Sequence, residues 1–348
     1  MRKLLLILPL IAITGVGCIN VRTETADAGG IFATADAGVK WSVRNALPLP
    51  QGVSSIGNIN IIGITYDPND AEALYLATAD SGLLVSYDDG DAWLRVKEEQ
   101  LRGGRINAVA VDPNNKCVVY VAKGSNIMKT SDCNRTYDTQ AFVETNGTAV
   151  TVVRVDWYNP NIVWLATASG DIVKSVDFGK SWTTVTRARS GIIDLMIDNS
   201  DSRIVLAATD KRGFWRTADG GATWTQSDAA LEGFTDANRG HGLAQAADGS
   251  VIYYTNDYGL LRSRDHGATW EAITLLTKPG STYIHSLAVN PKDSNNIFYG
   301  TATTLYSSID GGTTWATREL PTQRAATAMS IDPNETSVLL VGAATIED

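Results

Sequence analysis

Cationic and ring-bearing side chains recur in the segments that join the strand-rich parts of this 348-residue chain. Arginine, histidine and tyrosine carry N–H and O–H donors that fit the oxygens of carboxylate or sulfate groups. If the fold brings these segments to one surface, they could hold an anionic ligand; the alternative is that they are solvated loop charges. The candidates are Arg102, Arg105, Arg189, Arg239, His241, Tyr283, His285 and Arg324, with Arg187 beside them.

Carboxylates in the same parts of the chain suggest a second chemistry, because a glycoside hydrolase needs two carboxyl groups roughly 5–10 Å apart. The sequence does not give the distances among the candidates, which are Glu98, Glu99, Asp194, Asp236 and Glu271. The three histidines are scattered without metal-ligand spacing, so we predict no metal site and no cofactor. Phosphate-binding glycine loops and nucleophile elbows are also absent from the sequence.

A short turn motif, repeated seven times, defines the elements that must position these residues. Its first copy is Thr34-Ala-Asp36-Ala-Gly38-Val-Lys-Trp41, and successive motif aspartates are 42 to 52 residues apart. The seven aspartates are Asp36, Asp88, Asp132, Asp177, Asp219, Asp265 and Asp310. A fixed period of this length predicts a repeat architecture in which each unit packs on its neighbours. We call this pattern the Asp-turn motif.

The residue types of the Asp-turn motif indicate a structural role. Its aspartate can accept backbone N–H bonds within the turn, and glycine two positions later permits a positive φ. The aromatic residue can then pack between adjacent units, where a large ring buries most surface. We therefore expect none of the seven aspartates to be catalytic.

Each unit is predicted to contain four antiparallel strands, which is typical of a β-propeller blade. In one unit we expect strands at 106–111, 117–122 and 127–131, with a fourth beginning at Tyr137. Near the C-terminus, 327–331 and 337–341 supply only the first two strands of a blade. The N-terminal segments 30–34 and 41–43 supply the missing half, so we predict an all-β, seven-bladed propeller over residues 29–348 that is closed by its N-terminal strands.

The linking segments between blades are long and unequal, and variable loops on a rigid scaffold are where binding sites are expected. Those segments are 45–57, 97–104, 138–148, 227–241 and 278–283.

The first eighteen residues have the pattern of an export signal. Arg2 and Lys3 precede an apolar run from Leu4 to Ile13, which is too short to span a bilayer. Small residues before Cys18 resemble a bacterial lipoprotein signal, in which that cysteine is lipidated; an ordinary secretory signal is the alternative. We expect a signal peptide at 1–18, a linker at 19–28 and a membrane-anchored lipoprotein in the cell envelope. The net charge of −9 disfavours nucleic acid as a partner.

Two cysteines lie in the unit whose Asp-turn motif departs most from the pattern, with Asn134 for glycine and Tyr137 for tryptophan. Folding about the turn at 124–125 places Cys117 opposite Cys133. We predict a disulfide that compensates for the weakened turn, with two free thiols as the alternative.

The Asp-turn motif resembles the Asp box of the BNR repeat, and the resemblance covers the whole mature chain. BNR-type propellers include sialidases, xyloglucanases, sortilin-like receptors and the lipoprotein assembly factor of photosystem II. The Val111-Asp-Pro-Asn-Asn pattern is most similar to the sortilin and xyloglucanase branch. Sialidases carry an Arg-Ile-Pro element, xyloglucanases a second propeller, sortilins a cysteine-rich module and the photosystem factor a Gly-Trp-x-Val-Gly element; we find none of these.

The resemblance therefore implies the fold more firmly than the function. We expect a monomeric, non-enzymatic binding or assembly propeller whose loops bind a protein or glycan. The alternative is a BNR-type glycoside hydrolase or a glycan-binding lectin.

Overall fold

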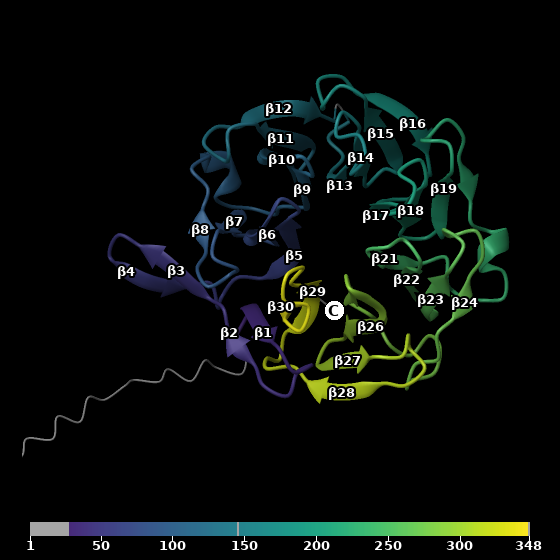
Figure 1. Cartoon of the computed structure of the whole chain (residues 1–348). Coiled ribbons are helices and arrows are strands. Elements are labelled where there is room, and N and C mark those ends of the chain that lie inside the picture. The colour runs from purple at the N-terminus through teal and green to yellow at the C-terminus, as the bar shows by residue number, and fades with distance from the viewer. Residues whose placement is uncertain (1–27, 145, 347–348) are drawn as a thin grey trace, which may run out of the picture.

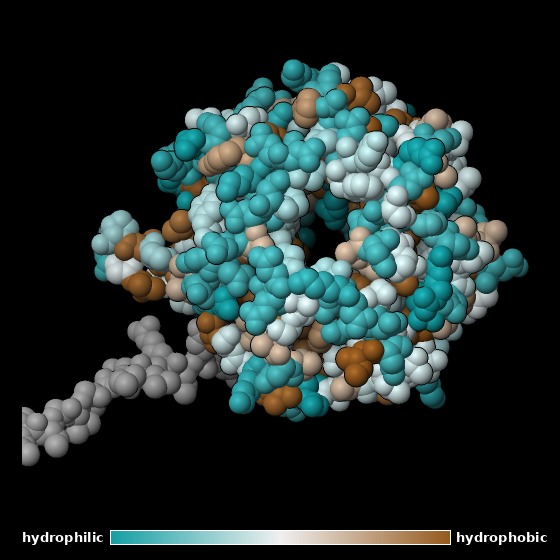
Figure 2. Space-filling view, in the orientation of Figure 1, coloured by the Kyte–Doolittle hydropathy of each residue, from teal (hydrophilic) through white to brown (hydrophobic). Residues whose placement is uncertain are grey.

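The computed structural model describes residues 28–144 and 146–346, and these form a ring of seven blades around a central channel (Figure 1). Each blade is a four-stranded antiparallel sheet, and a separate two-stranded hairpin projects from the rim beside β8. The space-filling view shows that the centre of the disc is open (Figure 2). The predicted seven-bladed, all-β architecture is confirmed.

The blades follow one another in chain order, each with its first strand innermost. Blade 1 contains β5 (Ile61–Asp67), β6 (Asp70–Thr78), β7 (Leu83–Ser86) and β8 (Leu94–Arg95). Blade 2 contains β9 (Ala108–Asp112), β10 (Asn115–Lys123), β11 (Asn126–Thr130) and β12 (Asp138–Val143). Blade 3 contains β13 (Val150–Val155), β14 (Val163–Thr167), β15 (Asp171–Ser175) and β16 (Thr183–Arg187).

The other half of the ring repeats this order. Blade 4 contains β17 (Ile192–Ile197), β18 (Val205–Thr209), β19 (Phe214–Thr217) and β20 (Thr225–Gln226). Blade 5 contains β21 (Gly240–Gln245), β22 (Ile252–Asn256), β23 (Gly259–Ser263) and β24 (Glu271–Ala272). Blade 6 contains β25 (Ser286–Asn290), β26 (Asp293–Gly300), β27 (Thr304–Ser308) and β28 (Ala316–Glu319). Two short 3₁₀ helices, η1 (Glu99–Leu101) and η2 (Ala229–Leu231), lie in linking segments.

Blade 7 is built from both ends of the chain. It contains β29 (Ala325–Ile331), β30 (Leu339–Ala344), β1 (Gly30–Thr34) and β2 (Ser42–Val43). The N-terminal β1 pairs with the C-terminal β30, with Phe32 opposite Val341. This pairing closes the ring as predicted, because β1 covers the edge that β30 would otherwise expose.

Each Asp-turn motif folds as a compact hydrogen-bonded turn. In blade 1 the Gly90 amide donates to the Ser86 hydroxyl at 2.9 Å, and the Ala92 amide donates to the Asp88 carboxylate at 2.9 Å. The Trp93 ring is fully buried and its Nε1 donates to the carbonyl of Arg44, in the segment that follows blade 7, at 2.7 Å. The motif therefore fastens one blade to the next.

The irregular motif of blade 2 has replacement contacts. Asn134 adopts a φ of 65°, accepts a bond from the Tyr137 hydroxyl at 2.6 Å, and donates to the Tyr75 hydroxyl of blade 1 at 3.0 Å. Cys117 and Cys133 are joined as a disulfide, and the Cys133 amide donates to the Cys117 carbonyl at 3.3 Å. The side-chain bonds and the disulfide both hold the turn without its usual glycine.

The linking segment at 45–57 is a hairpin, although the sequence predicts only a loop there. Its strands are β3 (Ala46–Leu49) and β4 (Gly52–Ser55), joined by a tight turn at Pro50 and Gln51. Prolines at 48 and 50 hid the strand pattern, because proline in a short run argues against a strand unless the strand lies at an edge.

Candidate functional site

The two faces of the disc carry different kinds of connection. One face, which we call the motif face, carries the Asp-turn motifs and the turns between the first and second strands. The opposite loop face carries the turns between the second and third strands and the segments that link the blades. All eight predicted ligand-binding residues come from linking segments or the first residues that follow them, and so belong to the loop face.

Four of the eight predicted residues lie together where blade 5 meets blade 6. His241 is at the start of β21, and Tyr283 and His285 lie just before β25. The rings of His241 and Tyr283 are stacked with centroids 3.9 Å apart, and His285 lies 4.6 Å from Tyr283 on the same centroid measure. Tyr283 is 54% exposed, so an accessible phenol ring is held between two imidazoles. The fourth member, Arg239, immediately precedes β21.

Asp257 completes this cluster and was not among the sequence candidates. Its carboxylate lies 2.7 Å from His241 Nε2 and 3.8 Å from Arg239 Nε. Its position between β22 and β23 was the available signal, because second-to-third-strand turns share the loop face with the linking segments. The Asp257 charge balances that of Arg239.

The two imidazoles of the cluster are neutral at pH 7. Burial lowers the pKa of His241 more than the hydrogen bond and charge of Asp257 raise it. Burial, and then the neighbouring His241, lower the pKa of His285. The expected concentration of cations is therefore absent from this cluster: one arginine is matched by one aspartate, and the rings present uncharged surface.

A groove of about 720 Å³ opens beside Tyr283. Hydroxyl side chains from the linking segment and from the β26–β27 turn form much of its wall. The lining residues are Ser281, Thr282, Tyr283, His285, Thr301, Ala302, Thr303, Thr304, Tyr306 and Ile346. An aromatic ring surrounded by hydroxyl donors and acceptors suits a neutral polar ligand better than a strongly charged one.

The other four predicted residues lie elsewhere around the ring. Arg102 Nε donates to the Val96 carbonyl at 3.0 Å, and Arg105 Nε donates to the Asn107 side chain at 3.2 Å. Arg324 donates through Nη1 to the Asn60 side chain at 3.0 Å, between blades 7 and 1. Arg189 is exposed between blades 3 and 4. The fold does not gather these arginines into the site at Tyr283.

Two of the candidate carboxylates, Asp194 and Glu271, lie on different blades and are each paired with an arginine. Asp194 is on β17, the innermost strand of blade 4, where its carboxylate meets Arg154 at 2.9 Å and accepts the Leu243 amide at 3.0 Å. Glu271 is on β24, the outermost strand of blade 5, and meets Arg262 at 2.8 Å. Among the groove-lining residues there is no aspartate or glutamate.

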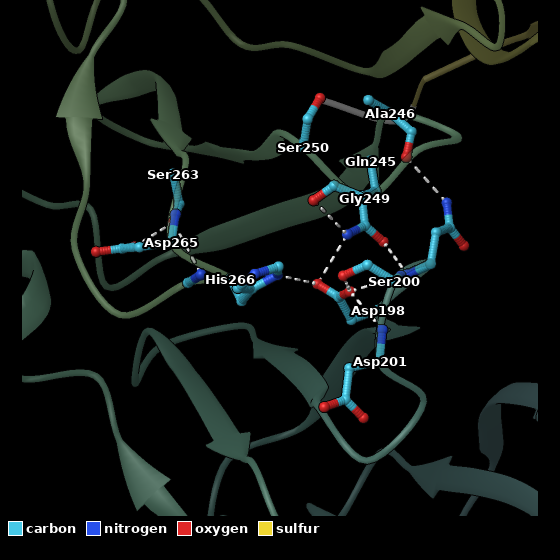
Figure 3. Close-up of polar contacts among 12 residues, drawn as sticks. Asp198, Ser200, Asp201, Gln245, Ala246, Gly249, Ser250, Ser263, Asp265 and His266 are labelled. Atoms are coloured by element: carbon cyan, nitrogen blue, oxygen red, sulfur yellow. Dashed lines mark hydrogen bonds and ion pairs between the residues drawn. The ribbon is translucent and has the colours of Figure 1, made fainter.

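A second polar cluster, on the motif face, joins blades 4 and 5 (Figure 3). The Asp198 side chain is fully buried and accepts the Ser200 amide at 2.8 Å, the Asp201 amide at 3.1 Å and Gln245 Nε2 at 2.8 Å. His266 Nδ1 lies 3.0 Å from the same carboxylate. With its partners supplied by two blades, this carboxylate serves to join them.

The described residues supply no obvious metal or membrane-spanning element. No group of three or more metal-ligating side chains converges within residues 28–144 and 146–346. No helix in the described part of the chain has the length and apolar character needed to cross a bilayer. Cys18 lies outside the described residues.

Comparison with known proteins decides the family. The family model described as photosynthesis system II assembly factor YCF48 matches residues 9–208, more than half of the chain. The chain belongs to this YCF48 family. The BNR-type resemblance is thereby supported, and the missing Gly-Trp-x-Val-Gly element does not exclude membership.

Individual relatives of this YCF48-family chain differ in length and activity. It is 24% identical to a xyloglucanase of Paenibacillus sp over 325 residues, covering 82% of this chain and 29% of the relative. It is 24% identical to the photosystem II assembly lipoprotein Ycf48 of Prochlorococcus marinus, covering 66% of this chain and 57% of the relative. The chain thus spans less than a third of the xyloglucanase.

A solved structure of YCF48 bound to a D1 peptide shares the fold. It superposes with a TM-score of 0.63 over 83% of this chain and 94% of that structure, at 16% identity. At this sequence identity the similarity shows a shared fold, and it does not identify the residues of this chain that bind a ligand.

Proposed function

We propose that the protein is a non-enzymatic binding or assembly propeller that holds a segment of a partner protein in the groove beside Tyr283. The observation that carries the proposal is the half-exposed Tyr283 ring fixed between His241 and His285. A preorganised aromatic ring loses little freedom on binding, which makes it an effective contact for a peptide. The neutral, hydroxyl-lined groove favours an uncharged polar or aromatic segment.

Family membership supports a protein partner. The related YCF48 structure is described as bound to a D1 peptide, and the Prochlorococcus relative as an assembly lipoprotein. We extend this to the present chain as export to the cell envelope, with lipidation at Cys18. Arg102, Arg105, Arg189 and Arg324 then provide contacts around the same face for a larger partner.

A photocrosslinking experiment tests the partner and the face together. A photoreactive amino acid at Ser281, in the groove wall, is expected to capture a protein in the native envelope; the same group at Ile309, on the motif face, is not. Peptides from the captured protein are then titrated against the Tyr283→Ala variant, with Tyr158→Ala as a matched control because Tyr158 is 76% exposed on the motif face.

Tyr283→Ala is expected to weaken peptide binding about tenfold or more, as for a central interface aromatic, and Tyr158→Ala to leave it unchanged. Equal effects of the two substitutions, or capture only from Ile309, would contradict the proposal.

Glycan binding or hydrolysis is the second candidate, favoured by the similarity to a xyloglucanase over 82% of the chain. An exposed aromatic ring such as Tyr283 can stack on a sugar. A glycan array and hydrolysis assays on sialosides and β-glucans test it. Turnover that is lost in Glu98→Gln or Asp194→Asn would establish an enzyme and reject the non-enzymatic proposal.

A further inference from the structure

The hairpin β3–β4 projects from the molecule (Figure 1) and carries no charged side chain. It extends outward from the rim of the disc beside blade 1 (Figure 1), and Figure 2 shows hydrophobic surface on it. The ten residues from Ala46 to Ser55 include no aspartate, glutamate, lysine or arginine. At its outer end Leu49 is 44% exposed and Val53 is 75% exposed. Exposed apolar groups concentrated on one projection indicate a contact surface.

Both faces of this hairpin tip are apolar. Side chains alternate between the faces of a strand, so Leu49 shares a face with the buried Leu47. Val53 pairs with Pro48 on the opposite face. A protein surface that packed on the hairpin would cover one face, whereas the hydrocarbon boundary of a bilayer surrounds both.

The base of the hairpin is held rigidly. Leu47 and Ile56 are buried in the core between blades 7 and 1, and the Trp93 amide donates to the Ala46 carbonyl at 2.8 Å. The tip therefore cannot fold back to hide its side chains without disrupting the core. An isolated two-stranded hairpin is only marginally stable, so this fixed base is what keeps the tip extended.

The N-terminal segment joins the propeller at the same place. The Gly29 amide donates to the Gly57 carbonyl at 2.6 Å, directly beyond the hairpin. Ten residues separate Cys18 from Gly29 in the sequence and reach at most about 35 Å. An anchor at the N-terminus would consequently hold the disc by the edge that carries the hairpin.

We propose that the hairpin tip inserts Leu49, Pro50 and Val53 into the headgroup and acyl boundary of a zwitterionic lipid surface. Near its base Arg44 is paired with Asp91 at 2.8 Å and lies 3.6 Å from Asp89, so this cation is already matched by carboxylates of the protein. Because the hairpin projects from the rim, insertion stands the disc edge-on to the bilayer (Figure 1). Both the loop face and the motif face then stay accessible to soluble partners.

The test tethers the chain from Ile19 onward through an N-terminal hexahistidine tag to phosphatidylcholine vesicles that contain a nickel-chelating lipid. This arrangement reproduces an N-terminal anchor and does not require lipidation of Cys18. An environment-sensitive fluorophore is attached at Gln51→Cys in the hairpin turn, with Ile309→Cys as the control, since Ile309 is 78% exposed on the motif face. Emission shift and quenching by a spin-labelled lipid report insertion.

The emission of the label at position 51 is expected to shift to shorter wavelength and to be quenched by the spin-labelled lipid, whereas the emission of the label at position 309 should show neither change. Leu49→Asp with Val53→Asp should reduce the bound-label signal about tenfold, because the substitutions remove the two aliphatic side chains that insertion would bury in the lipid. The melting temperature of the double variant should equal that of the parent protein, since both side chains are exposed. Equal signals at 51 and 309, or an unshifted label at 51, would overturn the proposal. Peptide binding at Tyr283 should be unaffected, which separates this test from that of the groove.

Discussion

His266 of blade 5 reaches across to blade 4, where its Nδ1 lies 3.0 Å from the carboxylate of Asp198 (Figure 3). Burial would raise the pKa of Asp198, but bonds from Ser200, His266 and Asp201 outweigh it and lower that pKa. The carboxylate is therefore ionised at neutral pH, and His266 must donate its Nδ1 proton to it. A buried charge with complete partners makes the junction of these two blades sensitive to substitution.

Asp198→Ala is expected to lower the free energy of unfolding by about 2–4 kcal/mol, because it orphans donors from both blades. Urea unfolding followed by tryptophan fluorescence measures this change. Asp248→Ala is the control, since the Asp248 carboxylate accepts the Ser250 amide within its own exposed turn; the loss on this substitution should stay below about 1 kcal/mol. Equal losses would show that the inter-blade partners of Asp198 contribute little.

The lowered pKa values of the motif aspartates should make the stability of the propeller sensitive to acid. Hydrogen bonds from Thr223 side chain and backbone, and from Thr217, hold the pKa of Asp219 to about 2, and the equivalent bonds do the same for Asp177 and Asp310. A depressed folded-state pKa gives stability that is present above about pH 4 and is lost as pH falls toward 2.

Substituting Asp219→Asn should flatten the dependence of melting temperature on pH between 4 and 2, compared with Glu319→Gln on the exposed strand β28. An unchanged slope in Asp219→Asn would argue that the motif carboxylates do not control acid unfolding.

Removing the disulfide is expected to weaken blade 2. The cysteines are 16 residues apart, and closing a loop of that size is worth about 3 kcal/mol in the unfolded chain. Cys117→Ser with Cys133→Ser should lower the unfolding free energy by about 2–4 kcal/mol, and a reducing agent should do the same to the parent protein alone. A reductant effect on the double variant would assign the loss to some other cause.

The groove should respond to mild acid through its imidazoles. The pKa of His241 lies below its ordinary value near 6.5, so the unfolded chain takes up protons first as pH falls. The free energy of unfolding should therefore fall as the pH drops from 7 below 6.5, and it should keep falling until the pH has passed the lowered pKa of folded His241. His241→Gln with His285→Gln should reduce that decline, as measured by urea midpoints at pH 7 and 5; a parallel decline in the variant would contradict this account.

The architecture could be predicted almost completely, whereas the site could be predicted only in part. The seven motif aspartates and the half-blades at each end determine blade number and closure, because repeat spacing is a local signal. The meeting of His241 with Tyr283 depends on the angle between two blades, which no local pattern encodes. Asp257 was missed because a lone aspartate in a turn is ordinarily a turn residue.

The predicted cationic surface also depended on information that the sequence does not contain, namely the positions of the basic residues in space and their burial. Arginines such as Arg102 and Arg105 occupy the predicted face, but they lie between blades 1 and 2, away from Tyr283, and each forms a local bond through Nε. Burial, which sequence does not give, leaves His241 and His285 uncharged. The number of basic residues along a chain therefore does not tell how many positive charges gather at one site.

The pairing of Phe32 with Val341 has a consequence for biosynthesis. The strand β1 is among the first parts of the propeller to be translated, but its partner β30 follows every other blade. The ring cannot seal during translation, and contacts so distant in sequence form slowly. The contact between β1 and β30 that closes the ring can therefore form only after the last blade has been synthesised.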